Sequence, residues 1–463
     1  MAQNRGLHRL TESKLTLNMS LTLISARWLI TATTHDSRVR TIEHASVLIA
    51  QDGRIVEVGS TAELKQRLDI TEWIELPNHL LAPGLINAHC HSAMTLLRGA
   101  ADDLPLERWL RERIWPMEQA LLDDAFVNTG TRLAAAEMLL GGTTSCVDMY
   151  FYSKAGAQAY LAMGQRAMLA LGIVDFPTSY AADADGYISV GLAARDAFID
   201  EPLLSFCLAP HAPYTVSDAT LESVAAFASE LGIPIHTHLQ ETAQEVTDAT
   251  AASNERPTAR LARVGLLGPD FFAAHCVHMN DEDIRAIALH GGSVVHCPSS
   301  NLKLASGLAP VAKFLAAGVN VALGTDGAAS NNRLDMFEEM RLAALIGKVQ
   351  ANDAAAVNAG EAFTMATLGG ARAMGLSAQI GSIETGKAAD LLAISLDAPA
   401  MKPLFDPVSH FVYTASRADV THVWVQGQPR VTDRALVGPA AQAMAELEPR
   451  ITAIAERVSA LRR

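Results

Sequence analysis

Short apolar runs recur through the middle of this chain, and each is followed by a longer stretch with helical periodicity. Apolar strands that alternate with helix-like stretches of ten or more residues are typical of parallel βα units. Eight such strands over about three hundred residues predict a closed (β/α)8 barrel. An open doubly wound sheet would usually carry a Gly-rich phosphate turn after an early strand, and the sequence has none. The eight predicted strands are Leu85–His89, Thr144–Met149, Ala167–Val174, Leu203–Ala209, Ile233–His238, Phe271–His275, Ser293–Cys297 and Val319–Gly324.

Both ends of the chain show a different pattern, in which short β-rich runs alternate with turns. Ala45–Ala50 and Arg54–Val58 flank an Asp52-Gly53 step, which is a strong hairpin signal. Runs of the same character follow at Ala389–Ile394 and Thr421–Gln428. We therefore predict a small β-sandwich built from both chain ends. The predicted division is a flexible leader over residues 1–18, β-sandwich over 19–80 and 385–440, barrel over 81–384, and a C-terminal helix over 441–463.

The bulk composition is that of a globular protein. The 463 residues are 49% hydrophobic and 19% charged, enough for a large barrel plus an accessory unit. The net charge is −14 and no Lys/Arg block is present, so we expect no nucleic-acid partner. No apolar run approaches the roughly twenty residues of a membrane helix. The first eighteen residues also lack the apolar core of a secretion signal.

The five cysteines lie in or just after apolar runs and show no CxxC spacing. Their odd number and context predict reduced core thiols in a cytoplasmic protein rather than a disulfide framework. A zinc site of the cytidine-deaminase type, which needs a PCxxC element, is excluded by the same spacing. The five residues are Cys90, Cys146, Cys207, Cys276 and Cys297.

Metal-capable side chains stand where several of these strands end. His89 and His91 are spaced i, i+2, so both rings lie on one face of an extended strand. His238 ends another strand and Asp326 follows the last one. Active sites of such barrels lie at the C-terminal ends of the strands, so these groups are expected to converge rather than to be packed separately. Three nitrogen ligands and one oxygen ligand suit one zinc ion best, with iron or manganese as alternatives.

Further residues at the same barrel face suit proton transfer. A bound divalent ion lowers the pKa of its water to roughly 7, and acid/base residues should stand beside it. Glu241 lies at the pocket mouth for proton shuttling, His275 is placed to orient the water, and Asp326 can take its proton as well as bind the ion. His236 shares a strand face with His238 but lies deeper, so it is interpreted as a hydrogen-bonded neighbour of a ligand.

Three other features have plainer interpretations. His278 and His296 lie near the predicted site, and a structural role is the simpler reading for each. The Ser299-Ser300-Asn301 run is most simply a loop that caps backbone groups.

Seven segments of the sequence form a recognisable set of motifs. They are PGLINAHCH (Pro83–His91), MTLLRG (Met94–Gly99), APHAPYT (Ala209–Thr215), HTHLQET (His236–Thr242), AAHCVH (Ala273–His278), HCPSSNLKL (His296–Leu304) and GTDGAASNN (Gly324–Asn332). Taken together, these motifs resemble the amidohydrolase superfamily, specifically the branch that deaminates methylthioadenosine and S-adenosylhomocysteine. The resemblance covers roughly residues 20 to 440.

The resemblance implies specific roles. His89, His91, His238 and Asp326 would bind the ion, while Glu241 and His275 would act on the water. Glu118 matches the acidic residue that holds the ribose hydroxyls, and His211 matches the one that hydrogen-bonds the purine. Hydroxide would attack the purine carbon that bears the amino group, and ammonia would leave. A homo-oligomer is expected at the level of the family.

One departure from the family concerns the substrate's 5′ group. Members that accept S-adenosylhomocysteine can carry an Arg at the end of the third strand, where it pairs with the substrate carboxylate. Leu171 stands at that position here, and the loop Asp175–Tyr187 has no Arg or Lys. An unpaired carboxylate in a partly buried pocket costs several kcal/mol, whereas an apolar methylthio group does not. The hypothesis is that methylthioadenosine and adenosine are better substrates than S-adenosylhomocysteine.

Other functions stay open at this point. The nearest alternative keeps the metal chemistry and changes the substrate to guanine, an oxidised purine or a triazine. A more distant one is a metal-binding scaffold without turnover, but a purely structural zinc needs neither Glu241 nor His275.

Overall fold

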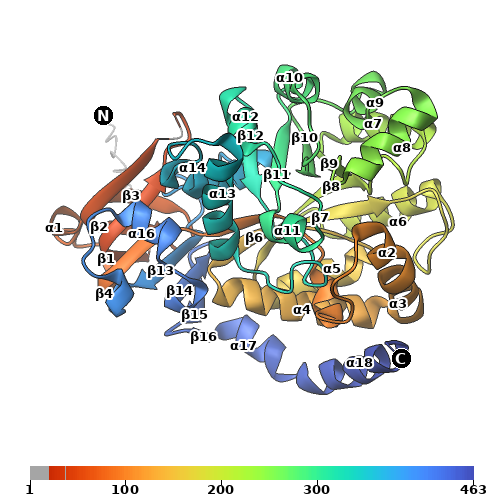
Figure 1. Ribbon diagram of the computed structural model, residues 1–463. Coiled ribbons are helices and arrows are strands. Elements are labelled where there is room, and N and C mark those ends of the chain that lie inside the picture. The colour runs from red at the N-terminus through yellow and green to blue at the C-terminus, as the bar shows by residue number, and fades with distance from the viewer. Residues whose placement is uncertain (1–19, 37, 463) are drawn as a thin grey trace, which may run out of the picture.

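A computed structural model describes residues 20–36 and 38–462 of the chain. The leader predicted over residues 1–18 lies outside them. Eight parallel strands follow one another in a single sheet from β5 to β12, which confirms the predicted barrel (Figure 1). The strands are β5 (Leu85–Cys90), β6 (Thr143–Tyr150), β7 (Arg166–Ile173), β8 (Leu204–Pro210), β9 (Ile235–Leu239), β10 (Phe271–His275), β11 (Ser293–His296) and β12 (Asn320–Leu323).

Almost every residue of these strands is buried, as expected for parallel strands that are covered on both faces. The ends of the sheet meet where the Asp326 amide donates a hydrogen bond of 3.0 Å to the carbonyl of His89. This bond joins the segment after β12 to β5. The barrel is therefore closed at the edge where the predicted ligands lie.

Helices surround the barrel, and several of them begin at a side-chain cap. Asp123 accepts a hydrogen bond from the Phe126 amide, and Asn280 forms a capping box with Asp283. The longer helices are α4 (Asp124–Leu140), α5 (Ser153–Met163), α6 (Ala184–Ala197), α7 (Asp218–Leu231), α8 (Ala243–Ser253), α10 (Asp281–His290) and α13 (Met336–Ala351). Shorter ones are α1 (Thr61–Leu64), α2 (Leu106–Trp109), α3 (Trp115–Leu121), α9 (Pro257–Arg263), α11 (Pro298–Lys303), α12 (Val311–Ala316), α14 (Ala359–Thr364), α15 (Gly370–Ala373) and α16 (Pro407–Tyr413).

A second sheet is built from both chain ends, as predicted. Its eight strands are hydrogen-bonded in the order β16-β15-β14-β13-β4-β1-β2-β3. The N-terminal and C-terminal strands are joined by β4, which pairs with β1 in parallel on one side and with β13 antiparallel on the other. The strands are β1 (Leu21–Ala32), β2 (Val39–Ala50), β3 (Ile55–Ser60), β4 (Ile70–Pro83), β13 (Leu391–Ser395), β14 (Val420–Val425), β15 (Gln428–Thr432) and β16 (Ala435–Leu436).

A buried ion pair links this sheet domain to the barrel. Arg166 begins β7, and its Nε lies 2.8 Å from a carboxylate oxygen of Asp390. The two side chains are only 6% and 3% exposed. The Arg166 guanidinium also donates to the carbonyl of Pro202, and Asp390 accepts from the Gln426 amide. Because both charges are paired and hydrogen-bonded, the desolvation cost of burying them is offset.

The C-terminal segment forms two helices, α17 (Gly438–Ala445) and α18 (Glu448–Leu461), with Pro449 in the first turn of the second. They run along the outside of the barrel below α4 (Figure 1). Ile454 and Val458 of α18 are buried in a cluster with Trp109 and Met117. The tail therefore supports the segment that contains α2 and α3.

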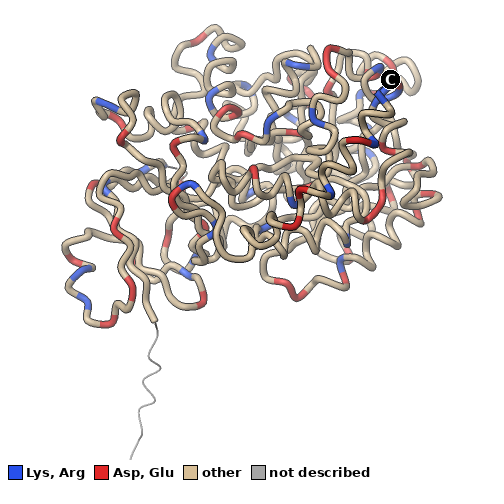
Figure 2. The backbone as a smooth tube through the Cα atoms, turned by 90° about the horizontal axis from the view of Figure 1, so that it is seen from below, with Lys and Arg blue, Asp and Glu red and all other residues tan. Residues whose placement is uncertain are grey.

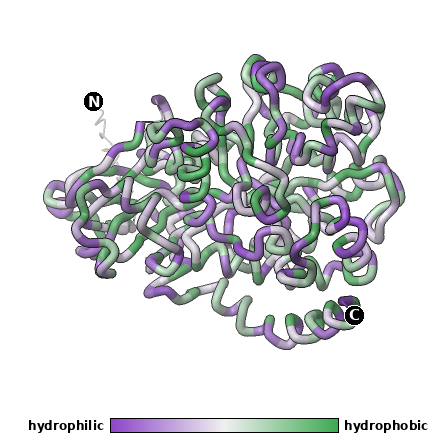
Figure 3. Tube along the Cα trace, in the orientation of Figure 1, coloured by the Kyte–Doolittle hydropathy of each residue, from purple (hydrophilic) through white to green (hydrophobic). Residues whose placement is uncertain are grey.

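Acidic and basic residues are interspersed along the backbone (Figure 2). Hydrophobic stretches concentrate in the interior of the molecule, and α18 alternates between the two types (Figure 3). All five cysteines are buried and free. No helix within the described residues is both long and apolar enough to cross a bilayer.

Candidate active site

Five side chains from four strand ends converge at the C-terminal face of the barrel. His91 Nε2 lies 3.1 Å from Asp326 Oδ1 and 3.3 Å from His238 Nε2. His89 Nε2 lies 3.4 Å from the same Asp326 oxygen. His275, at the end of β10, stacks on His238 with ring centroids 5.5 Å apart. Segments that are far apart in the sequence thus supply one compact donor group.

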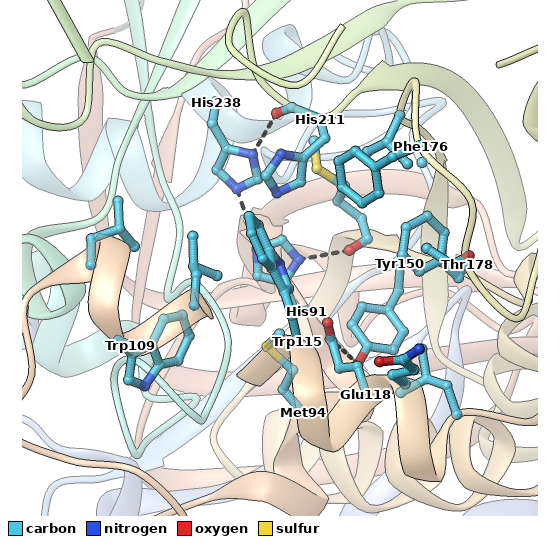
Figure 4. A pocket seen from close by; sticks show the side chains of 18 of the residues that line it. His91, Met94, Trp109, Trp115, Glu118, Tyr150, Phe176, Thr178, His211 and His238 are labelled. Carbon is cyan, nitrogen blue, oxygen red and sulfur yellow. Dashed lines mark hydrogen bonds between the residues drawn. The ribbon is translucent and has the colours of Figure 1, made fainter. Parts of the chain in front are cut away.

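Each of these imidazoles is oriented through its Nδ1 atom. His91 Nδ1 donates to the Met149 carbonyl at 2.6 Å, and His238 Nδ1 donates to the His211 carbonyl at 2.6 Å (Figure 4). A carbonyl can only accept, so the proton is on Nδ1 and the lone pair of Nε2 points into the site. His275 Nδ1 lies 2.8 Å from Asn301 Oδ1 and is held in the same way.

His236 completes the orientation of His89. The Nδ1 atom of His236 donates to the carbonyl of Phe272 at 3.0 Å, so its Nε2 is left as an acceptor. That Nε2 lies 2.8 Å from His89 Nδ1. His236 therefore lies behind His89 and holds its ring with Nε2 toward the other donors.

The donor group fits a divalent metal ion. His89 Nε2 is buried and has no hydrogen-bond partner within the described residues, which is costly unless the atom binds something. Ligand atoms of His89, His238, His275 and Asp326 all lie within 4.8 Å of one another. This set differs by one residue from the predicted one, with His275 in place of His91, because five donors rather than four share the site. Nitrogen and carboxylate donors of this kind suit zinc.

Two hydroxyl groups fix the Asp326 carboxylate. Ser300 Oγ and Ser330 Oγ each donate to Oδ2 at 2.6 Å, which leaves Oδ1 facing the imidazoles. Burial alone would raise the pKa of Asp326, but the adjacent imidazoles of His89 and His91 hold it well below its usual range. The Ser299-Ser300-Asn301 run was expected to cap a loop. It lies instead in the short helix α11, where Ser300 and Asn301 hold Asp326 and His275.

Glu241 stands beside the donor group, two residues after the end of β9. Its Oε2 lies 3.8 Å from His275 Nε2, and its Oε1 accepts a hydrogen bond from Ser306 Oγ at 3.2 Å. The side chain is buried, and burial raises the pKa of its carboxyl group. A carboxyl group with a raised pKa beside an imidazole is suited to acid/base catalysis.

The donor group forms the floor of a cavity of about 610 Å³, a volume suited to a small organic molecule (Figure 4). Glu118, on α3, lines another part of the wall and accepts a hydrogen bond of 2.6 Å from the Tyr150 hydroxyl. Burial raises the pKa of Glu118 to about 7. His211 also lines the cavity, and burial lowers the pKa of its ring to about 3, so the ring is neutral at pH 7. A single cavity therefore contains every predicted catalytic and substrate-binding residue.

The rest of the wall is largely apolar. Trp109, Trp115 and Phe176 line it, and no Lys or Arg belongs to the lining within the described residues. Leu171 does not face the cavity, because it packs outward against Gly191 of α6. The neighbouring Gly172 is the residue of β7 that lines the cavity.

The remaining histidines lie outside the cavity lining. His278 Nε2 is 2.7 Å from the carbonyl of Ser306, so this ring holds the segment that carries the serine next to Glu241. His296 is 2% exposed at the end of β11. Neither residue contacts the metal donors through a hydrogen bond.

Residues 80–430 match the model of the amidohydrolase family. The chain is 49% identical to a 5-methylthioadenosine/S-adenosylhomocysteine deaminase from Teredinibacter turnerae, over 89% of this chain and 92% of that protein. It is 43% identical to a 5′-deoxyadenosine deaminase from Methanopyrus kandleri, over 86% and 92% of the two chains. Among solved structures, an adenosine deaminase from Xanthomonas campestris with bound zinc superimposes with a TM-score of 0.91 and 44% identity, covering 95% of this chain and 98% of that one.

Proposed function

The chain belongs to the amidohydrolase family, and from that premise we propose that it hydrolytically deaminates adenine nucleosides, releasing ammonia and the inosine analogue. The observation that carries the proposal is one cavity with two kinds of group. Metal donors and the buried Glu241 lie on one side of it, and Glu118 lies where it can accept hydrogen bonds from a ribose. A free base has no ribose hydroxyl to donate to Glu118.

We propose that His89, His91, His238 and Asp326 bind the ion, with His275 beside it. When bound, a divalent ion such as zinc lowers the pKa of its water to about 7 and so supplies a nucleophile at neutral pH. Asp326 Oδ1 accepts a proton from the attacking water, because Oδ2 is already occupied by two serine hydroxyls. His275 Nε2 orients that water, since its Nδ1 is fixed by Asn301.

Glu241 is the proton donor. Burial raises the pKa of its carboxyl group, which favours the protonated form, and in that form it can pass its proton to the purine nitrogen next to the carbon under attack. The neutral His211 ring hydrogen-bonds the purine and holds that carbon over the donor group. The proton that Asp326 accepted from the water passes to the amino group, which leaves as ammonia, and the proton of the new hydroxyl group restores Glu241.

The proposal is tested by measuring ammonia release with a panel of adenosine, deoxyadenosine, methylthioadenosine, S-adenosylhomocysteine, adenine, guanine and a triazine. Release from the adenine nucleosides, and much less from the free bases, is expected. Turnover of guanine or the triazine above that of every nucleoside would contradict it.

Within the nucleosides, we propose that methylthioadenosine and adenosine are preferred to S-adenosylhomocysteine. Apart from the site residues, the cavity wall is largely apolar, and no Lys or Arg in the described part of the chain lines it to pair with the homocysteine carboxylate. Arg111, in the segment between α2 and α3, lines a neighbouring cavity and pairs with Glu107 at 3.2 Å. Comparison of kcat/KM for the two thioethers tests this point, and a clear preference for the homocysteine compound would contradict it.

We also propose that the protein works in the cytoplasm as a homo-oligomer. Five buried, free cysteines suit a reducing compartment. Fractionation of cells and light scattering of the purified protein test the two statements.

A further inference from the structure

A second carboxylate, Glu245, lies directly behind the proposed proton donor. It is the third residue of α8, and each of its carboxylate oxygens accepts one backbone hydrogen bond. Oε1 accepts from the Gln240 amide at 2.9 Å, and Oε2 accepts from the Glu241 amide at 2.9 Å. One side chain thus holds two successive peptide groups, including the one that carries the Glu241 side chain.

This arrangement is not the usual N-terminal cap of a helix. The cap of α8 is Thr242, whose hydroxyl accepts from the Glu245 amide. In a capping box the third helical residue would bond the amide of the cap itself. Glu245 instead reaches past Thr242 to the two residues before it. Its carboxylate therefore serves the segment between β9 and α8 rather than the helix end alone.

The segment needs such support because its backbone is unusual. Gln240 has a φ of +49°, a conformation that residues with a side chain adopt infrequently. Its own side chain is fully bonded, since its amide donates to the His278 carbonyl at 3.0 Å and its oxygen accepts from the Thr258 amide at 3.1 Å. The sharp turn at Gln240 is thus fixed from both sides, and the direction in which Glu241 leaves it is fixed as well.

The Glu241 side chain has little else to hold it. One hydrogen bond of 3.2 Å from Ser306 is its only side-chain hydrogen bond within the described residues. We propose that Glu245 is a positioning residue that sets the place of Glu241 beside His275, and so controls the proton-transfer step. This inference rests on the proposed function of Glu241. Misplacing a reacting group by about 1 Å can cost about a hundredfold in rate, so the expected effect is large.

Glu245 can be replaced without emptying the core. On its outer side it lines a second cavity of about 920 Å³, together with Asp248 and Ala249 of the same helix. The informative variants are Glu245→Gln, which keeps the length but has only one accepting oxygen, and Glu245→Ala, which has none. Thr242→Ala is the matched control, because it removes the cap of the same helix and leaves the two carboxylate bonds in place.

For the zinc-loaded protein with adenosine, we expect kcat to fall about thirtyfold or more in Glu245→Ala and by a smaller factor in Glu245→Gln. KM should stay within about threefold and the zinc content should not change, because Glu118, His211 and the donors are untouched. Thr242→Ala should lower the melting temperature but keep kcat within about twofold. A kcat of Glu245→Ala equal to that of the control would overturn the inference.

Crystal structures separate this inference from the proposed function. In Glu245→Ala, or in Glu245→Gln should the alanine variant not fold, Glu241 should leave its place 3.8 Å from His275 Nε2 or occupy several positions. Finding Glu241 unmoved would refute the positioning role even if the wild type deaminates no nucleoside. If Glu241 moves in the variant and the wild type deaminates no nucleoside, the positioning role is supported and the proposed function is refuted.

Discussion

Replacement of Glu118 tests the substrate assignment most directly. The carboxylate accepts a hydrogen bond of 2.6 Å from Tyr150, and its second oxygen has no protein hydrogen bond within the described residues. Two ribose hydroxyls can donate to it. A hydrogen bond to a charged group contributes about 1.5–3 kcal/mol, which corresponds to about 10- to 150-fold in kcat/KM for each hydroxyl.

The assay is a coupled measurement of ammonia release from adenosine, 2′-deoxyadenosine and 3′-deoxyadenosine. For the wild type, loss of a hydroxyl that Glu118 binds should lower kcat/KM by about that factor. In Glu118→Ala the rate with adenosine should fall, and the discrimination between adenosine and the deoxynucleosides should largely disappear. This double comparison removes effects of the mutation that have nothing to do with the ribose. Equal discrimination in wild type and variant would refute the assignment.

The same residue predicts a pH dependence. Burial raises the pKa of Glu118 to about 7, so the carboxylate that accepts two hydroxyls is lost as the pH falls below 7. The wild-type kcat/KM for adenosine should therefore decrease toward acidic pH by up to tenfold per pH unit. Glu118→Gln cannot titrate and should lack this part of the profile. A profile that is identical in both proteins would assign the acidic limb to another group.

Three further predictions concern catalysis, the ion and stability. Glu241→Gln should lower kcat by about 10²- to 10⁴-fold with unchanged zinc content, and a kcat within tenfold of the wild type would argue against the proton-donor role. Chelation should abolish ammonia release and lower the melting temperature, and addition of zinc should restore both. The reason is that an ion at a hundred times its Kd stabilises the fold by about 2.7 kcal/mol. An unchanged melting temperature after chelation would contradict the assignment of the donor group as an ion site. Burial raises the pKa of Glu339 from 4.5 to about 8. Between pH 4.5 and pH 8 the folded protein therefore binds a proton at Glu339 that the unfolded chain does not bind, and the free energy of unfolding should decrease as the pH rises through that range. The free energy of unfolding, measured with urea, should decrease less between pH 5 and pH 8 in Glu339→Gln than in the wild type. Equal decreases in the two proteins would refute this prediction.

The barrel could be predicted because its strands are short, apolar and regularly spaced. The run Phe271–His275 forms β10 with the same bounds, and Val319–Gly324 contains β12. The first half of β4 could not be predicted as a strand, and the reason is physical. Glu72, Trp73 and Glu75 are exposed there, so the segment lacks the apolar alternation that marks a half-buried strand.

The metal donors could also be predicted, because they occupy strand ends that one barrel face must bring together. Their hydrogen-bond partners could not. Asn301 and Ser330 reach His275 and Asp326 only because α11 and the segment after β12 fold back over the sheet. Nothing in the local sequence distinguishes these side chains from other polar residues of a loop or a short helix. Their roles depend on tertiary geometry, which hydrophobic periodicity does not encode.

The backbone at the ends of these strands explains why that geometry is specific. Gln240, His275 and Asp326 have φ values of +49°, +70° and +60°. A sequence-based argument would place glycine at such turns, since a side chain there costs of order 1–3 kcal/mol. Yet two of the three side chains belong to the donor group that fits a metal ion, and the third is fully hydrogen-bonded. The surrounding bonds must therefore over-determine each turn. Glu245, Asn301, Ser300 and Ser330 supply those bonds. The contacts that orient the side chains of the site thus also offset its backbone strain. Substitution of these supporting residues should therefore lower the rate of ammonia release and the stability of the fold together.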